Sequence, residues 1–327
     1  MANDSIRGLD VKSSKPGASD SPRVLFMGMA GAFSLPPLAA LLAAGIPVAA
    51  VLVPALRPLM PETPPVRPVR PVPVASDLPL VTPFAERTII HLAWEQGIPI
   101  YQVGRLGDPA VLTLARNLAP TAICVACFPA ILPPALLAIP PAGALNIHPS
   151  LLPAYRGPAP IFWVFRHGER RTGVTVHLMD AGIDSGDIVA QEAFELPVGI
   201  SGTEVNRRSA EIGARLLVEA VQAAGNGNLT RRPQDEREAT YFSWPTAADF
   251  ELATTRPARW AFNFIRGADE WGRQFEIVVA GQHIPVETAR DWSPDARLAT
   301  PFRVEGDEIL VQFSPGVLRA VLATDRW

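Results

Sequence analysis

The sequence predicts a two-domain α/β protein, and three observations carry this prediction. The chain has 327 residues, which is long for a single hydrophobic core. From residue 23 onwards, short apolar runs alternate with helical segments, as in a Rossmann-like, mostly parallel sheet. Beyond residue 240 short strands dominate, which indicates a small β-rich, barrel-like (OB-like) domain. The expected divisions are a disordered tail at 1–22, an α/β domain at 23–225, a linker at 226–239 and a C-terminal domain at 240–327.

The composition favours a globular protein without a membrane-spanning segment. Hydrophobic residues make up 48% of the chain and charged residues 19%. The net charge of -3 gives no overall attraction to nucleic acid, although a local basic patch stays open. The tail has no apolar run typical of a signal peptide, and other apolar runs are too short to cross a bilayer. We therefore expect no membrane association.

The two cysteines do not predict a disulfide. Cys124 and Cys127 fall on one predicted buried strand, and residues three apart on a strand face opposite sides. We expect both to act as small core hydrophobes. Two thiols without a bridge fit a reducing compartment, which favours a cytoplasmic location.

The α/β domain opens with a buried strand at 24–28, a glycine-bearing turn and a helix from about 36 to 44. The glycines do not complete G-x-G-x-x-G, so the signal for a dinucleotide site is weak. A second strand at 48–53 leads into a proline-rich segment at about 54–83, which carries several arginines. So much proline predicts an extended surface loop, either functional or merely solvated.

The elements that follow continue the alternation of helix and strand. We expect helices at about 84–95 and 109–118, the second opened by Asp108 and Pro109 as N-cap and first residue. Strands at 98–101 and 122–128, a short helix near Leu136 and a strand from about residue 143 complete this part. Because ligands bind outside the carboxyl ends of parallel strands, Gly28, Phe128 and the pair Asn146 and His148 should surround one crevice.

The second half of the chain yields a further set of expected elements. They are helices at about 160–166, 201–223 and 257–266, and strands at about 173–179, 188–194, 275–279, 304, 309–313 and 317–322.

Asn146 and His148 are the leading catalytic candidates. Residues two apart on a strand point the same way, so both should project from one strand end before Pro149 stops the ladder. An amide donor beside an imidazole can polarise a carbonyl and transfer a proton. The acidic turn at 180–187 lacks the full calcium-loop pattern, so we expect no metal. A carboxylate from this turn that orients His148 is the better motivated interpretation.

Three motifs together resemble the formyltetrahydrofolate-dependent formyltransferase family. They are N-I-H-P-S-L-L-P at 146–153, Y-R-G-P-A-P at 155–160 and D-A-G-I-D-S-G-D at 180–187. The R-G-x-A-P-I form resembles methionyl-tRNA and amino-sugar formyltransferases more than glycinamide ribonucleotide formyltransferases, whereas H-P-S resembles the glycinamide branch. Residues 257–272 and 316–319 weakly resemble the second domain of methionyl-tRNA formyltransferases.

The resemblance implies the formyltransferase fold and a set of site residues. Asn146, His148 and Asp184 would be catalytic, with 10-formyltetrahydrofolate as co-substrate. Asn146 would stabilise the oxyanion, His148 would handle the proton, and Asp184 would orient His148 and favour its charged form. The folate would contact a crevice formed by Phe128, Ile131, Leu132, Ser150, Leu151, Leu152, Pro153, Asp180 and Asp187.

The amine that accepts the formyl group is open at this point. The resemblance favours the amino group of methionyl-initiator tRNA, and Arg256, Arg259, Arg266 and Arg273 offer one basic face. A nucleotide-linked amino sugar or another small amine is the alternative, with Trp244, Trp260 and Trp271 as candidate platforms for a base. A formyltetrahydrofolate hydrolase and a non-catalytic folate-binding module are further alternatives. The sequence indicates no oligomeric state.

Overall fold

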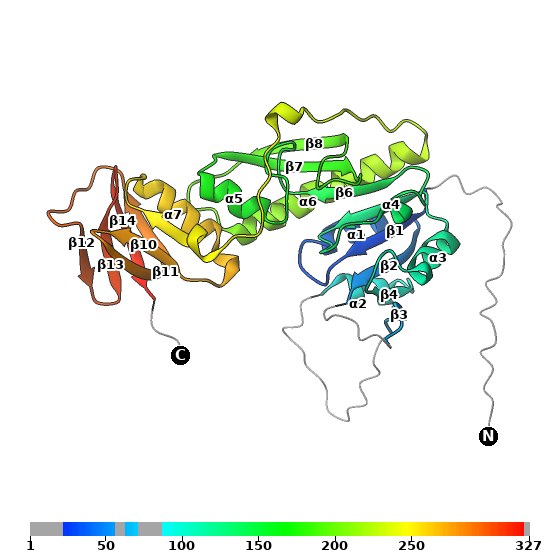
Figure 1. Ribbon diagram of the computed structural model, residues 1–327, viewed down its shortest axis with the longest axis horizontal. Coiled ribbons are helices and arrows are strands. Elements are labelled where there is room, and N and C mark those ends of the chain that lie inside the picture. The colour runs from blue at the N-terminus through cyan, green and yellow to red at the C-terminus, as the bar shows by residue number, and fades with distance from the viewer. Residues whose placement is uncertain (1–21, 56–62, 71–86, 324–327) are drawn as a thin grey trace, which may run out of the picture.

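The computed structural model describes residues 22–55, 63–70 and 87–323, and it has two lobes (Figure 1). The first lobe holds an eight-stranded sheet of order β3-β4-β2-β1-β5-β6-β7-β8. Its strands are β1 (Val24–Gly28), β2 (Val48–Pro54), β3 (Val66–Pro68), β4 (Ile100–Val103), β5 (Ala122–Ala126), β6 (Ala144–His148), β7 (Arg171–Leu178) and β8 (Ile188–Glu195). Its helices are α1 (Leu35–Ala43), α2 (Ile89–Glu95), α3 (Pro109–Leu118), α4 (Pro134–Leu137), α5 (Pro160–His167) and α6 (Gly202–Gly225).

The central strands of this sheet are parallel and its outer strands are not. β4, β2, β1, β5 and β6 pair in parallel, whereas β3 pairs antiparallel with β4, and β7 and β8 complete the other side antiparallel. This confirms the predicted α/β class with a mostly parallel sheet. The carboxyl ends of β1, β5 and β6 lie at one edge, since these strands run side by side.

Helices pack on both faces of the sheet, so its central strands are buried on both sides. Val24 and Phe26 of β1 belong to the core that includes α1, α2 and α6. Leu25 and Met27, which point the opposite way, pack in a second core with α3 and α4. The helix α6 lies so close to β6 that a Cβ at Gly213 would be 2.4 Å from Ile147 Cγ2, so this contact requires glycine.

Three sequence-based expectations need correction. The proline-rich segment is not loop throughout, because Val66–Pro68 forms the edge strand β3, where proline is tolerated. The helix expected from residue 84 begins at Ile89, after the N-cap Thr88, and residues 84–86 lie outside the described part of the chain. Cys127 is exposed, with a φ of 57°, because β5 ends at Ala126; only Cys124 is a core residue. Both thiols are free.

The second lobe is a six-stranded sheet of order β12-β13-β14-β11-β10-β9, packed against one helix (Figure 1). The elements are β9 (Glu251–Ala253), α7 (Ala258–Gly267), β10 (Phe275–Val279), β11 (Gln282–Ser293), β12 (Phe302–Glu305), β13 (Glu308–Gln312) and β14 (Val317–Leu322). Short 3-10 turns occur at Glu236–Glu238, Ala247–Phe250 and Asp269–Trp271. The predicted β-rich C-terminal region is confirmed.

The two lobes share one hydrophobic core. Phe162 of α5 contacts the rings of Phe250, Phe264 and Trp271, with centroids 5.1 to 5.3 Å apart. The indole of Trp260 on α7 donates to the carbonyl of Arg166 at 2.9 Å. Within the part of the chain described here, no helix is both long and apolar enough to cross a membrane.

Candidate active site

Asn146 and His148 lie at the end of β6, in the register that the sequence predicts. The neighbouring antiparallel strand β7 places His177 directly opposite Asn146 and Thr175 opposite His148. The imidazoles of His148 and His177 therefore come together, with ring centroids 6.4 Å apart. Both imidazoles are buried, with 4% and 1% exposure, so their polar atoms must find partners inside the protein.

Those partners fix the orientation of each imidazole. His148 Nε2 lies 2.8 Å from the carbonyl of Tyr155 and must donate to it, which leaves Nδ1 as the basic nitrogen. His177 Nδ1 lies 3.0 Å from the carbonyl of Leu178 and donates in the same way. Its Nε2 accepts from the side-chain amide of Asn146 at 3.1 Å. The second N–H of the Asn146 amide has no partner among the described residues and can donate to a ligand.

Asp184 faces both imidazoles. Its Oδ2 lies 3.6 Å from His148 Nδ1, and its Oδ1 lies 3.6 Å from His177 Nε2. The backbone N–H of Gly157 donates to Oδ2 at 2.9 Å and links the carboxylate to the loop that follows β6. The three predicted catalytic residues thus meet at one place, and His177 joins them.

The loop at 180–187 presents Asp184 through its own hydrogen bonds. Asp180 Oδ1 accepts from the Gly182 N–H at 2.9 Å and from the Ser185 hydroxyl at 2.8 Å, which closes a turn around Asp184. Asp184 itself has a φ of 52°, a left-handed conformation that aspartate tolerates better than bulky residues. Asp180 therefore holds the turn together.

A charged carboxylate lies beside a neutral imidazole in this site. Burial of Asp184 opposes its ionisation, but the positive charge that His148 carries in acid and the Gly157 N–H outweigh burial and hold the pKa of Asp184 well below its usual range. For His148, burial lowers the pKa and outweighs the Asp184 carboxylate, which raises it. Asp184 raises the pKa of His148, the direction that the resemblance implies, but the larger effect of burial makes the net shift downward. His148 is thus a neutral base beside a carboxylate that can stabilise its imidazolium.

Of the expected folate residues, some are accessible and others are built into the core. Ile131 is 65% exposed, and Ile183 of the acidic loop is 43% exposed, which is unusual for large apolar side chains beside a site. Phe128 is half-buried against the second core. The others lie as follows: Leu132 and Leu152 are buried, Ser150 donates to the Ala154 carbonyl, Leu151 and Pro153 are half-buried, and Asp187 is 3.6 Å from Arg231.

Burial makes Leu132, Ser150 and Leu152 poor direct contacts for a ligand. The Ser150 hydroxyl is fully buried and already has its partner at 2.7 Å. Ile131, Ile183 and Phe128 keep exposed side-chain surface, and contact of Ile131 and Phe128 with the folate stays a prediction.

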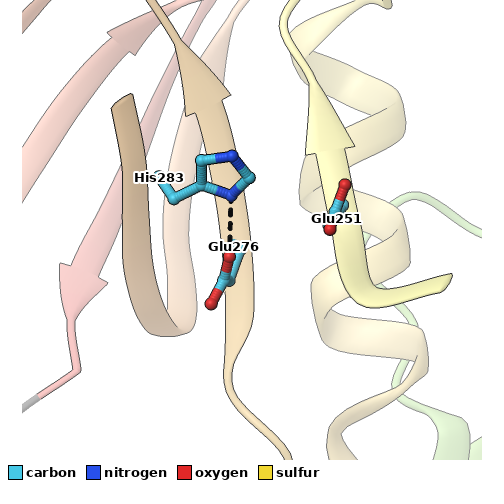
Figure 2. Close-up of side chains that lie close together, drawn as sticks. All are labelled: Glu251, Glu276 and His283. Carbon is cyan, nitrogen blue, oxygen red and sulfur yellow. Dashed lines mark hydrogen bonds and ion pairs between the residues drawn. The ribbon is translucent and has the colours of Figure 1, made fainter. Parts of the chain in front are cut away.

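Within the described ranges, the site holds no group of three or more side chains that could share a metal ion. Among the described residues, one such group consists of Glu251, Glu276 and His283, on β9, β10 and β11 of the second lobe (Figure 2). All three are exposed, and the His283 imidazole pairs with Glu276 at 2.9 Å. They belong to the outer surface of the C-terminal sheet.

Comparison with known proteins identifies the family. A family model described as formyl transferase matches residues 79–221. A methionyl-tRNA formyltransferase of Anaeromyxobacter dehalogenans (strain 2CP-1 / ATCC BAA-258) is 38% identical over 221 residues, which cover 67% of this chain and 70% of that protein. The chain belongs to the methionyl-tRNA formyltransferase family. A member from Synechococcus sp. (strain JA-3-3Ab) is 45% identical over 176 residues, a match that spans only 55% of its length.

Solved structures share the fold over nearly the whole chain. An N-formyltransferase from Helicobacter canadensis, in complex with folinic acid and dTDP-3-aminofucose, covers 91% of this chain with a TM-score of 0.66 at 16% identity. HypX from Aquifex aeolicus, in complex with tetrahydrofolic acid, covers 91% of this chain and 43% of its own, with a TM-score of 0.57 at 15% identity. The predicted family and fold are confirmed.

Sequence reasoning missed His177 and Gln234 at this site. His177 appeared only as part of an alternating strand, and its place beside Asn146 depends on antiparallel pairing that periodicity does not reveal. Gln234 lies in a polar segment without periodicity and binds the carbonyl oxygens of Asp184 and Gly186. The only available signal for His177 was its position at the end of a strand just before the acidic loop.

Proposed function

We propose that this protein transfers the formyl group of 10-formyltetrahydrofolate to the amino group of methionyl-initiator tRNA. The observation that carries the proposal is the convergence of Asn146 and His148 with Asp184, whose carboxylate is 3.6 Å from the His148 imidazole. Membership in the methionyl-tRNA formyltransferase family supports both the co-substrate and the acceptor. A cytoplasmic location stays a prediction, with the free thiols as its support.

The residues present can perform each step of formyl transfer. The amine attacks the formyl carbon, and the carbonyl oxygen becomes an oxyanion that the free N–H of Asn146 stabilises, which is worth about 3–4 kcal/mol per donor. His148 accepts the proton that the amine loses, and the imidazolium is then stabilised by Asp184. As the bond between the formyl carbon and N10 of the folate breaks, His148 returns the proton to N10. Neutral His148 and ionised Asp184 are the resting states that this sequence of steps requires.

Two exposed arginines support a phosphate-bearing acceptor. A cavity of about 330 Å³ lies near the carboxyl ends of β1 and β2 and is lined by Met29, Arg67, Arg70 and Gln102 among others. Neither guanidinium has a hydrogen-bond or ion-pair partner among the described residues. Unpaired arginines at the ligand-binding edge of the sheet are suited to phosphate contacts. We expect Arg67→Ala and Arg70→Ala to raise the KM for tRNA and to leave the KM for the folate unchanged.

The basic face that the sequence suggested is largely engaged within the protein. Arg256 donates to the carbonyls of Arg166 and His167 at 2.9 and 3.1 Å, and Arg266 donates to that of Gly199 at 2.8 Å. Arg273 lies against the Phe250 ring. Arg256 and Arg266 thus bind backbone of the first lobe, and the cavity beside Arg67 is the better candidate for contact with the acceptor.

Exposed aromatic side chains favour an acceptor that carries a nucleobase. Trp244 is 62% exposed and Tyr241 is 54% exposed, whereas Trp260 is buried and Trp271 packs on Phe162. Of the three expected platforms, only Trp244 is available for stacking. Because this feature would also receive a nucleotide-linked amino sugar, such a sugar is the second candidate acceptor.

A formyl-transfer assay with both acceptors tests the proposal. Wild-type protein with 10-formyltetrahydrofolate should formylate charged initiator tRNA and not amino sugars, and Asn146→Ala and His148→Ala should lose most of this activity. Transfer to a sugar alone would replace the first acceptor with the second. Hydrolysis of 10-formyltetrahydrofolate to tetrahydrofolate and formate, without an acceptor, would indicate a hydrolase. Folate binding with neither reaction would indicate a binding module.

A further inference from the structure

The segment that follows α6 does not lead directly to the second lobe. It first lies across the acidic loop at 180–187, called the catalytic loop below because it carries Asp184. Arg232 exchanges two backbone hydrogen bonds with Ile188, at 2.8 and 2.9 Å, just beyond the loop. Two residues later, the side-chain amide of Gln234 donates to the carbonyls of Asp184 and Gly186, both at 2.7 Å. The backbone from the Asp184 carbonyl to the Gly186 carbonyl is thus held from outside the loop.

The orientation of the Gln234 amide is fixed by chemistry. Two carbonyl oxygens can only accept, so the NH2 group must face the loop. The amide oxygen in turn accepts from Arg156 Nε at 3.1 Å and Arg156 Nη2 at 2.8 Å. The Arg156 side chain is 10% exposed and also pairs with Glu236 at 2.7 Å. Every polar atom of the Gln234 amide is therefore engaged.

Arg156 connects the loop that follows β6 with Gln234. It precedes Gly157, whose N–H binds the Asp184 carboxylate at 2.9 Å. It also follows Tyr155, whose carbonyl accepts from His148 at 2.8 Å. The side chain of Arg156 reaches Gln234, and Gln234 reaches the backbone of Asp184. The loop that orients His148 and the loop that presents Asp184 are thus joined by one glutamine.

We propose that Gln234 is a positioning residue for formyl transfer, which holds Asp184 against His148 by binding the two carbonyls of the catalytic loop. This inference rests on the proposed function. It assigns a role in the reaction to a residue beyond the matched family region, which ends at residue 221. Without the amide, the loop carbonyls lose both donors and Asp184 loses the support for its left-handed backbone.

Replacement of Gln234 should slow the reaction without weakening substrate binding equally. Gln234→Glu turns two donors into acceptors that face carbonyl oxygens, and Gln234→Met removes them without adding charge. We expect kcat to fall roughly ten- to a hundredfold, because displacement of a catalytic group by about 1 Å costs about this much. The KM for tRNA should change less than about threefold, since Gln234 contacts the loop and Arg156 rather than the exposed arginines.

The test compares Gln234→Met and Gln234→Glu with the control Gln222→Glu, an exposed position on α6. Kinetics are measured with initiator tRNA, and melting curves show whether each variant is folded. If Gln234→Glu does not fold, Gln234→Met decides. A fall in kcat for Gln234→Met with an unchanged control supports the proposal, and wild-type kcat overturns it.

An NMR titration of the His148 imidazole separates this proposal from the proposed function, because it needs no substrate. The groups that face His148 are Asp184 from the acidic loop, His177 from β7 and the Tyr155 carbonyl. If Gln234 holds Asp184 in place, the His148 imidazole of Gln234→Met should titrate at lower pH than that of the wild type, because the carboxylate moves away from it. An unchanged titration in a folded variant overturns the positioning role even if no acceptor is ever formylated.

Discussion

Replacement of Asp184 by asparagine should impair catalysis while the fold persists. The side chain keeps its shape, and its amide oxygen can still accept from the Gly157 N–H, which is 2.9 Å from the carboxylate. What disappears is a charge 3.6 Å from His148 Nδ1. With an effective dielectric constant of about 20, Coulomb's law gives about 4 kcal/mol for a charge pair near that distance. If this energy acts when His148 becomes an imidazolium, kcat should fall by about 10³-fold.

The assay is formyl transfer from 10-formyltetrahydrofolate between pH 5 and 9, with wild-type protein, Asp184→Asn and the exposed control Asp295→Asn. Because the carboxylate raises the pKa of His148 against the effect of burial, its loss should move the acid limb of the rate profile to lower pH. A fall in kcat of less than about tenfold, or an acid limb at higher pH, would refute the reasoning.

Three further predictions follow from the same contacts. Gly157→Ala should destabilise the protein by about 3 kcal/mol in urea unfolding, because its φ is 111° and a Cβ would be 2.0 Å from the Phe242 carbonyl oxygen; unchanged stability would contradict that geometry. Ile131→Asp should raise the KM for the folate about tenfold with stability unchanged, since Ile131 is 65% exposed; an unaltered KM would remove it from the folate site. Because burial lowers the pKa of His148, the unfolded chain binds a proton there at higher pH than the native protein does, so unfolding free energy should decline as pH falls below about 6.5, and less steeply in His148→Gln.

The parts of the site that share one short motif were accessible from sequence. Asn146 and His148 are two apart on a strand, so their common direction follows from the strand period alone. Asp184 was predicted because the D-A-G-I-D-S-G-D motif of the acidic loop occurs together with the N-x-H pair of that strand. His177 and Gln234 were not found, because their positions depend on strand pairing and on a segment without periodicity.

Local rules also explain the errors in the fold. Proline density marked residues 54–83 as loop, yet an edge strand needs few donors, and Val66–Pro68 satisfies that requirement. Cys127 was assigned to the core because the apolar run continues past Ala126, where the strand in fact ends. Apolar character predicts burial on average, but the end of a strand is set by its neighbours in the sheet.

The core shared by the two lobes limits how this protein can choose its acceptor. Phe162 lies among Phe250, Phe264 and Trp271, so the lobes cannot separate without exposing these rings to water. The distance from the Asp184 carboxylate to the second sheet is then fixed by this packing. We therefore expect the size and shape of an acceptor to decide whether it fits between the site and the second sheet.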